Sequence, residues 1–239
     1  MRFFSYESKA SQILLKLGQS CWLNVLWLIC SLPIFTLGAA TAALYTVTLK
    51  MVKDREGDIA LPFFRAFRDN FKQATILWLI LLGAGLLLGA DGYILYHLSR
   101  TTTGPMAVAW TLMLALIIVA AVACVIVLLY VFPLVASVVN TNAAMLKNSL
   151  FIGLRYLFCT ICLMAIHFAM FFVAVRFFTP ILIFGEGLCA LLSSMLLSGV
   201  IAACTRDPEE QDAEEAEAVE SGDEGEEEDT GGEDEEDTP

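Results

Sequence analysis

Four largely apolar runs of 22 to 26 residues constrain the fold of this chain more than any other feature. The hydrocarbon core of a bilayer is about 30 Å thick, so about 20 helical residues cross it. Lipid offers no partner for a backbone N–H or C=O group, and runs of this length are therefore expected to be helices. The sequence predicts an all-α, polytopic transmembrane helical bundle. The four runs are Ala74–Tyr96, Ala107–Phe132, Leu157–Phe178 and Ile181–Cys204.

Charge is sorted along the chain in a way that predicts two parts. Residues 1–206 hold all 14 Lys and Arg but only 7 of the 26 Asp and Glu, and the remaining 19 acids follow from Asp207 onward. A segment so acidic and so poor in apolar residues cannot bury enough surface to offset the entropy of ordering. We expect a transmembrane domain over residues 1–205 and a disordered acidic tail over 206–239. The tail is expected to be a solvated extension, and folding back onto the basic cytoplasmic loops is the alternative.

The first apolar stretch, Ser20–Leu49, is interrupted by Pro33 and Gly38. Proline removes a backbone donor and disfavours the helical conformation of the residue before it, so a helix break is expected here. Both flanks of the stretch are basic, and the positive-inside rule places basic flanks in the cytoplasm. This favours a hairpin or re-entrant pair over a single kinked span. A signal peptide cleaved near Ala39 is a third possibility.

The same rule orients the remaining runs and gives five to six membrane passes in total. The short Gly104-Pro105 turn is expected outside, while the segment with Lys147 and Arg155 and the C-terminus are expected in the cytoplasm.

Two segments are predicted to be amphipathic helices in the head-group plane. Around a helix, Phe63, Phe67 and Phe71 fall on one side, and Arg65 and Arg68 fall on the other. Such a helix dips its apolar face into the acyl boundary and keeps its cations near anionic lipid. Residues 1–17 show a similar separation. The alternative function of both segments is to dock a cytoplasmic partner.

Polar and ionisable side chains inside membrane spans are costly and are therefore the candidate functional residues. His167 lies near the middle of its run and is expected to bond a neighbouring carbonyl or hydroxyl, or to relay a proton. Arg176 and Glu186 flank the turn between the last two runs, where they are predicted to pair. Asp91 is expected to reach water, and Asn24 is expected to donate a hydrogen bond between helices.

The chain carries no pattern typical of an enzyme. These residues form no triad, no paired-carboxylate site and no metal-ligand spacing, and no glycine-rich phosphate loop is present. The seven cysteines are spread over apolar runs, and Cys159-Thr160-Ile161-Cys162 lacks the setting that activates a redox pair. We expect no enzymatic activity, no cofactor, no metal and no nucleic-acid partner, and the sequence predicts no oligomeric state. Gly85 and Gly89 form a GxxxG pattern that is expected to pack within the bundle.

Motifs in the first 80 residues resemble those of the YesL family of bacterial integral membrane proteins. They are Leu26-Trp27, Ser31-Leu32-Pro33, Thr36-Leu37-Gly38-Ala39-Ala40-Thr41-Ala42-Ala43-Leu44-Tyr45, Phe63-Phe64-Arg65-Ala66-Phe67 and Asn70-Phe71-Lys72-Gln73. The resemblance implies a protein of the bacterial cell membrane whose activity is unknown, with no catalytic residues to carry over. It also implies association with carbohydrate uptake, and hence an accessory or regulatory component of which a carbohydrate transporter subunit would be a partner. A small-solute carrier or channel is the alternative.

Overall fold

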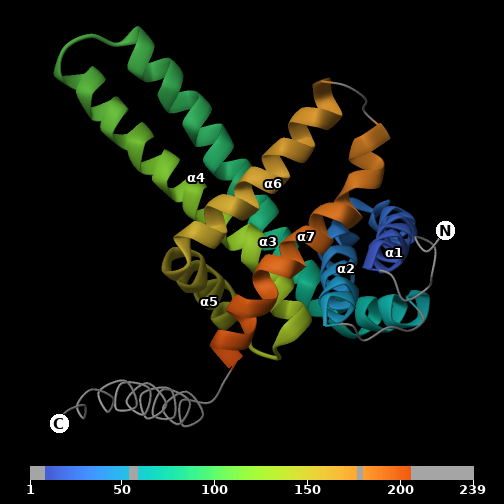
Figure 1. The fold of residues 1–239 in the computed structure, drawn as a ribbon. Coiled ribbons are helices and arrows are strands. Elements are labelled where there is room, and N and C mark those ends of the chain that lie inside the picture. The colour runs from blue at the N-terminus through green and yellow to red at the C-terminus, as the bar shows by residue number, and fades with distance from the viewer. Residues whose placement is uncertain (1–8, 54–58, 177–179, 206–239) are drawn as a thin grey trace, which may run out of the picture. The chain divides into compact units, whose positions relative to one another are not determined.

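The computed structural model describes residues 9–53, 59–176 and 180–205, without the side chains of 9–14, 174, 180–184 and 205 (Figure 1). All regular secondary structure in these ranges is helical, so the predicted all-α class is confirmed. The predicted acidic tail lies outside the described residues. The described residues up to Val200 belong to one compact unit, and 201–205 complete the final helix beyond it.

Seven α-helices and one short 3-10 turn, η1, make up the described chain. In order they are α1 (Lys9–Ser31), η1 (Ile34–Thr36), α2 (Leu37–Val52), α3 (Ala60–Thr101), α4 (Pro105–Ser137), α5 (Asn142–Arg155), α6 (Leu157–Arg176) and α7 (Pro180–Thr205).

Helices α1 and α2 form an antiparallel hairpin, which confirms the predicted break. The indole N–H of Trp27 donates to Thr41 Oγ1 at 3.2 Å, and these two residues are equally far in sequence from Ile34 at the turn. The turn is closed by Thr36, whose hydroxyl lies 2.6 Å from the carbonyl oxygen of Cys30 and 2.7 Å from that of Pro33. A single kinked span is therefore excluded.

The tip of this hairpin lies part of the way along α3. Helix α2 has 16 residues, about 24 Å at 1.5 Å per residue, and together with η1 it forms the 19-residue candidate span Ile34–Val52. At the tip, the Trp78 indole N–H donates to the carbonyl oxygen of Ile34 at 2.8 Å. Beyond Trp78, α3 continues for 23 residues to Thr101, about 35 Å further.

Helix α2 is the central helix of the bundle, because small residues let α1, α3 and α4 pack closely around it. A Cβ atom on Gly38 would lie 2.5 Å from the carbonyl oxygen of Ala74 and 2.6 Å from Trp78 Cβ, so only glycine fits there. Four alanines that follow are fully buried: Ala39, Ala40, Ala42 and Ala43. The alanine-rich motif is thus a packing surface.

Four helical segments are long and apolar enough to cross a membrane: Ile34–Val52, Ala60–Thr101, Pro105–Ser137 and Gly185–Cys204. A fifth is obtained if the bent pair α5 and α6 is counted as one span. The structure thus gives four to five candidate spans, where the sequence predicted five to six membrane passes. Long apolar side chains of α3 and α4, such as Leu86 and Leu116, are exposed. This is the surface expected of a membrane protein, in which lipid covers the outer faces of the helices.

The hairpin of α3 and α4 turns at Gly104, which adopts a positive φ of 79° that a residue without Cβ tolerates (Figure 1). Helix α4 then continues through Pro133, where the sequence predicted an end, and stops only at Ser137. A proline is tolerated inside a membrane helix where neighbours cover the freed backbone groups, and Pro133 is fully buried.

The predicted interfacial helix around Phe63 is not a separate element. It forms the first turns of α3 and continues into the span without a break, because no Gly or Pro separates the two. Phe63 is fully buried in the protein and does not dip into lipid, although Phe64 is half exposed. Part of the apolar face of this amphipathic segment therefore packs against the bundle and not against lipid.

Helices α5 and α6 meet at Tyr156 with a bend of 100°. The Thr160 hydroxyl donates to the carbonyl oxygen of Gly153 at 2.7 Å and lies 2.9 Å from the Tyr130 hydroxyl. Because the carbonyl can only accept, Tyr130 donates to Thr160 when Thr160 donates to Gly153. This relay attaches the bend to α4.

Candidate functional site

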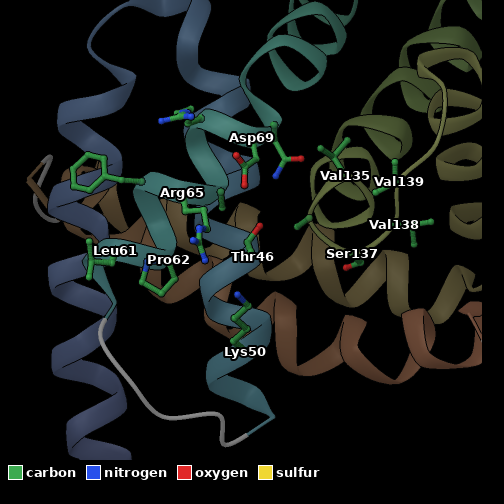
Figure 2. Close-up of a pocket in the computed structure, with 15 residues that line it drawn as sticks. Thr46, Lys50, Leu61, Pro62, Arg65, Asp69, Val135, Ser137, Val138 and Val139 are labelled. Atoms are coloured by element: carbon green, nitrogen blue, oxygen red, sulfur yellow. The ribbon is translucent and has the colours of Figure 1, made fainter.

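The larger of the two described pockets lies where α2 ends, α3 begins and α4 ends, and has a volume of about 840 Å³ (Figure 2). Its lining contains three cations and one carboxylate: Lys50, Arg65, Arg68 and Asp69. Other polar lining groups are Thr46, Asn70 and Ser137. The remaining lining is mostly apolar and includes Leu61, Pro62, Phe64, Val135, Val138 and Val139. We call this the basic pocket.

Two of the cations approach each other from different helices. Figure 2 shows Lys50 of α2 and Arg65 of α3 pointing toward one another, with Val135, Val138 and Val139 on the opposite wall. No ion pair reaches Lys50 or Arg65 within the described ranges, although Asp69 follows Arg65 by one turn of α3. Like charges at close range repel, so an anion between them would be stabilised by both.

One wall of the basic pocket is held in place by a hydrogen bond between distant parts of the chain. The side-chain amide of Gln73 in α3 donates to the carbonyl oxygen of Asn140 at 2.6 Å. The backbone N–H of Thr141 donates to Asn140 Oδ1 at 2.8 Å, and Thr141 caps α5. The segment that follows Val139 is thereby attached to the same helix that supplies Arg65.

Buried polar groups inside the bundle are largely bonded to one another. Asn24 is fully buried, and its Oδ1 accepts a hydrogen bond from the backbone N–H of Gly187 at 2.8 Å. The predicted interhelical bond of Asn24 is therefore present, but in this bond the side chain accepts. The hydroxyls of Thr48 and Ser194 lie 2.7 Å apart and join α2 to α7. These contacts hold α7 against the hairpin.

Of the predicted site residues, His167 and Glu186 are the two ionisable ones that the structure brings near each other. His167 Nδ1 lies 2.9 Å from the carbonyl oxygen of Leu163, and the carbonyl requires that nitrogen to carry the proton. The expectation that His167 bonds a carbonyl is therefore confirmed. Glu186 interacts electrostatically with His167. One turn along, Met170 packs against Gly185, so α6 and α7 are in contact here.

The other two predicted site residues lie apart from this pair. Arg176 is exposed at the end of α6, and no ion pair joins it to Glu186 in the part of the chain that the structure describes. The predicted pairing of these two residues is therefore wrong: the ionisable side chain near Glu186 is His167, which shares the α7-facing side of α6 with Met170. Asp91 is exposed on the surface of α3, and its access to water stays a prediction.

The GxxxG pattern also differs from its prediction. A Cβ atom on Gly85 or Gly89 would meet nothing within 4 Å, so among the described residues no helix approaches these two glycines closely. The two glycines instead line an apolar groove of about 400 Å³ between α3 and α4. Among the described residues, no cluster of three or more His, Cys, Asp or Glu is placed to hold a metal.

Sequence reasoning identified the cations of the basic pocket as loop and interfacial charges but missed that Lys50 and Arg65 converge. The predicted topology was sufficient to infer this meeting. Two consecutive helices that cross the membrane in opposite directions place the last turn of the first beside the first turns of the second. Lys50 is in the last turn of α2, and Arg65 is in the second turn of α3.

Two comparisons with known proteins give matches. Residues 21–92, which begin within α1 and end within α3 and include Lys50 and Arg65 but not the α4 wall of the pocket, match a family described as "Protein of unknown function, DUF624". A protein of Bacillus subtilis (strain 168) named "Uncharacterized protein YesL" is 33% identical over 116 residues. That alignment covers 47% of this chain and 51% of the relative, so the chain spans about half the length of the curated relative. No solved structure gives a significant match.

Proposed function

We propose that this chain, which is a YesL-like protein of a family of unknown function, is an accessory or regulatory component of the bacterial cell membrane. Its association with carbohydrate uptake and utilisation, through a transporter subunit as partner, is part of this proposal and follows from the resemblance alone. The observation that supports the accessory role is the basic pocket, where Lys50 and Arg65 converge and three cations share the lining with one carboxylate, Asp69. An excess of cations in a concave site is a binding feature.

The interior of the bundle supports a binding role more than transport. Asn24, Thr48 and Tyr130 each bond to a neighbouring helix, so these polar groups stabilise the fold. A buried polar group that already has its partner has little capacity left for a solute. The pocket at the helix ends is instead open and polar on one wall.

Crosslinking in native membranes tests the accessory role. The full-length chain, carrying an affinity tag, is crosslinked in its own host and purified, and the co-purifying proteins are quantified. The expected result is a stoichiometric membrane transporter subunit that is lost when Lys50→Gln and Arg65→Gln are combined. Lys147→Gln with Arg155→Gln is the matched control, because it removes the same charge from α5, outside the pocket lining. Recovery of the chain without any transporter subunit would contradict the proposal.

A small-solute carrier or channel is the second candidate, favoured by polar groups inside the bundle. Glu186 lies within electrostatic range of His167, and the buried hydroxyls of Ser20 and Ser193 have no hydrogen-bond partner among the described residues. Flux of labelled sugars into liposomes that contain only this protein tests this candidate. Flux that disappears in His167→Ala would favour the carrier. Flux no greater than in protein-free liposomes would leave the accessory role as the better account.

A further inference from the structure

Among the described residues the basic pocket has an excess of cations, three against the one carboxylate of Asp69, and this excess favours an anionic ligand. Arg65 presents a planar fork of donors and Lys50 a compact ammonium group, and both bind phosphate oxygens well. Asn70 adds a neutral amide, while the hydroxyls of Thr46 and Ser137 donate to carbonyl oxygens of their own helices at 2.9 and 2.8 Å and can only accept from a polar substituent of the ligand. The ligand is therefore expected to carry a phosphate with polar substituents around it.

The position of the pocket along the helices corresponds to the depth of lipid head groups. Lys50 lies in the last turn of α2, Arg65 precedes the apolar part of α3 by about two turns, and Ser137 is the last residue of α4. Three candidate membrane spans thus begin or end at the pocket. Basic pockets between transmembrane helices at this level suit anionic phospholipid head groups.

Exposed apolar side chains on the lining favour a lipid over a soluble phosphate compound. The exposed fraction is 73% for Leu61, 49% for Phe64 and 98% for Val139. A free phosphate ion gains nothing from such side chains, whereas the glycerol and upper acyl carbons of a lipid would cover them.

We propose that the basic pocket binds the phosphate of an anionic phospholipid head group, with Lys50 and Arg65 on the phosphate oxygens and the apolar lining on the upper acyl chains. This inference rests on the proposed function, since it takes the pocket as the binding face of an accessory protein and assigns its ligand. The bond from Gln73 to Asn140 keeps the wall in place before the lipid arrives, so little ordering cost remains on binding.

Lipid binding to the full-length chain in nanodiscs tests the inference. Native mass spectrometry counts retained lipid when phosphatidylglycerol is titrated into discs of phosphatidylcholine. For Lys50→Gln with Arg65→Gln, the affinity for phosphatidylglycerol is expected to fall on the order of 30-fold. Each basic group near the membrane surface raises the affinity for an anionic lipid by a factor of about five, and two such groups are removed. The control pair Lys147→Gln and Arg155→Gln is expected to change it less than about threefold. Equal loss in both pairs would overturn the inference.

A charge-preserving variant separates binding from folding. Lys50→Arg combined with Arg65→Lys retains both cations and is expected to retain most of the affinity. The variant with Lys50→Gln and Arg65→Gln, here called the neutral pair, could fail to purify as a folded protein. In that case the wild-type protein is labelled with phosphatidylglycerol that carries a photoreactive group near its phosphate. Labelling of peptides that contain Lys50 or residues 61–70 supports the inference, and labelling only elsewhere overturns it.

Two further arms identify the source of the phosphate and separate this inference from the proposed function. Phosphatidylglycerol in the discs is expected to raise the melting temperature of the protein. Inorganic phosphate, added to discs of phosphatidylcholine alone, is expected to leave that temperature unchanged. An equal rise with inorganic phosphate would overturn the lipid assignment. If the neutral pair loses the transporter subunit but retains phosphatidylglycerol, this inference fails and the accessory role stands. If it loses phosphatidylglycerol, and wild type also lacks a transporter subunit, the lipid site stands and the accessory role fails.

Discussion

Asn24 Oδ1 accepts a hydrogen bond from the backbone N–H of Gly187 at 2.8 Å, and this bond joins two helices whose contacting residues are 163 positions apart in the sequence. The approach is close because residue 187 has no side chain: a Cβ atom there would lie 2.5 Å from the carbonyl oxygen of Ser20. A polar bond and a steric fit therefore act at the same crossing of α1 and α7, a combination typical of helix packing in membranes.

Replacing Asn24 with Leu is expected to lower the stability of the bundle. The change keeps the branched shape of the side chain but leaves the crossing without its hydrogen bond, which costs about 1–2 kcal/mol in a membrane bundle. The measurement is unfolding in mixed micelles, followed by circular dichroism. Ile29→Ala on the same helix is the control, because Ile29 is exposed and its removal is expected to change the stability much less. An equal loss for both variants would show that this bond contributes nothing specific.

Replacing Gly187 with Ala is expected to destabilise the bundle by about 1–3 kcal/mol through overpacking, since the obstructing atom is a backbone oxygen that cannot rotate away. Gly199→Ala tests the same substitution on the same helix, at a position where a Cβ atom meets nothing within 4 Å. That control is expected to be neutral or slightly stabilising, because alanine favours helix over glycine. Thermal unfolding of the two purified variants in one detergent makes the comparison, and a Gly187→Ala protein as stable as Gly199→Ala would contradict the close crossing.

Replacing Trp78 with Phe is expected to loosen the tip of the α1 and α2 hairpin. The ring remains large enough to fill most of the space beside Phe132, but the donor to the Ile34 carbonyl oxygen is lost. The expected loss of stability is about 1 kcal/mol. Faster hydrogen exchange is also expected in residues 31–37, measured by mass spectrometry. Trp110→Phe is the control, because it lies on α4, away from the tip; faster exchange at the tip in this control as well would remove the role of Trp78.

The sequence predicted the helical class, the membrane spans and the hairpin, because long apolar runs and Pro33 act through local physics. It did not predict α5 or the bend at Tyr156, since a moderately polar segment shows no strong period before its tertiary contacts are known. The site was only partly predictable for the same reason. Asn24 was found as an unusual group in an apolar run, whereas the meeting of Lys50 and Arg65 depends on how two helices pack.

The two ends of α4 are expected to lie on opposite sides of the membrane. The helix has 33 residues, about 50 Å, so Thr103 before it and Ser137 at its end cannot both be accessible from one side. Basic residues such as Lys50 and Arg65 line the pocket at the Ser137 end, and the positive-inside rule places that end in the cytoplasm.

Cysteine labelling measures this orientation directly. In a background whose seven free cysteines are replaced, a membrane-impermeant maleimide is expected to label Thr103→Cys in intact cells. The same reagent is expected to label Ser137→Cys only after the cells are permeabilised. The opposite pattern would invert the orientation and place the basic pocket outside. In that case the cations would face away from the leaflet whose negative surface potential attracts them, and the cytoplasmic placement of the C-terminus would be wrong as well.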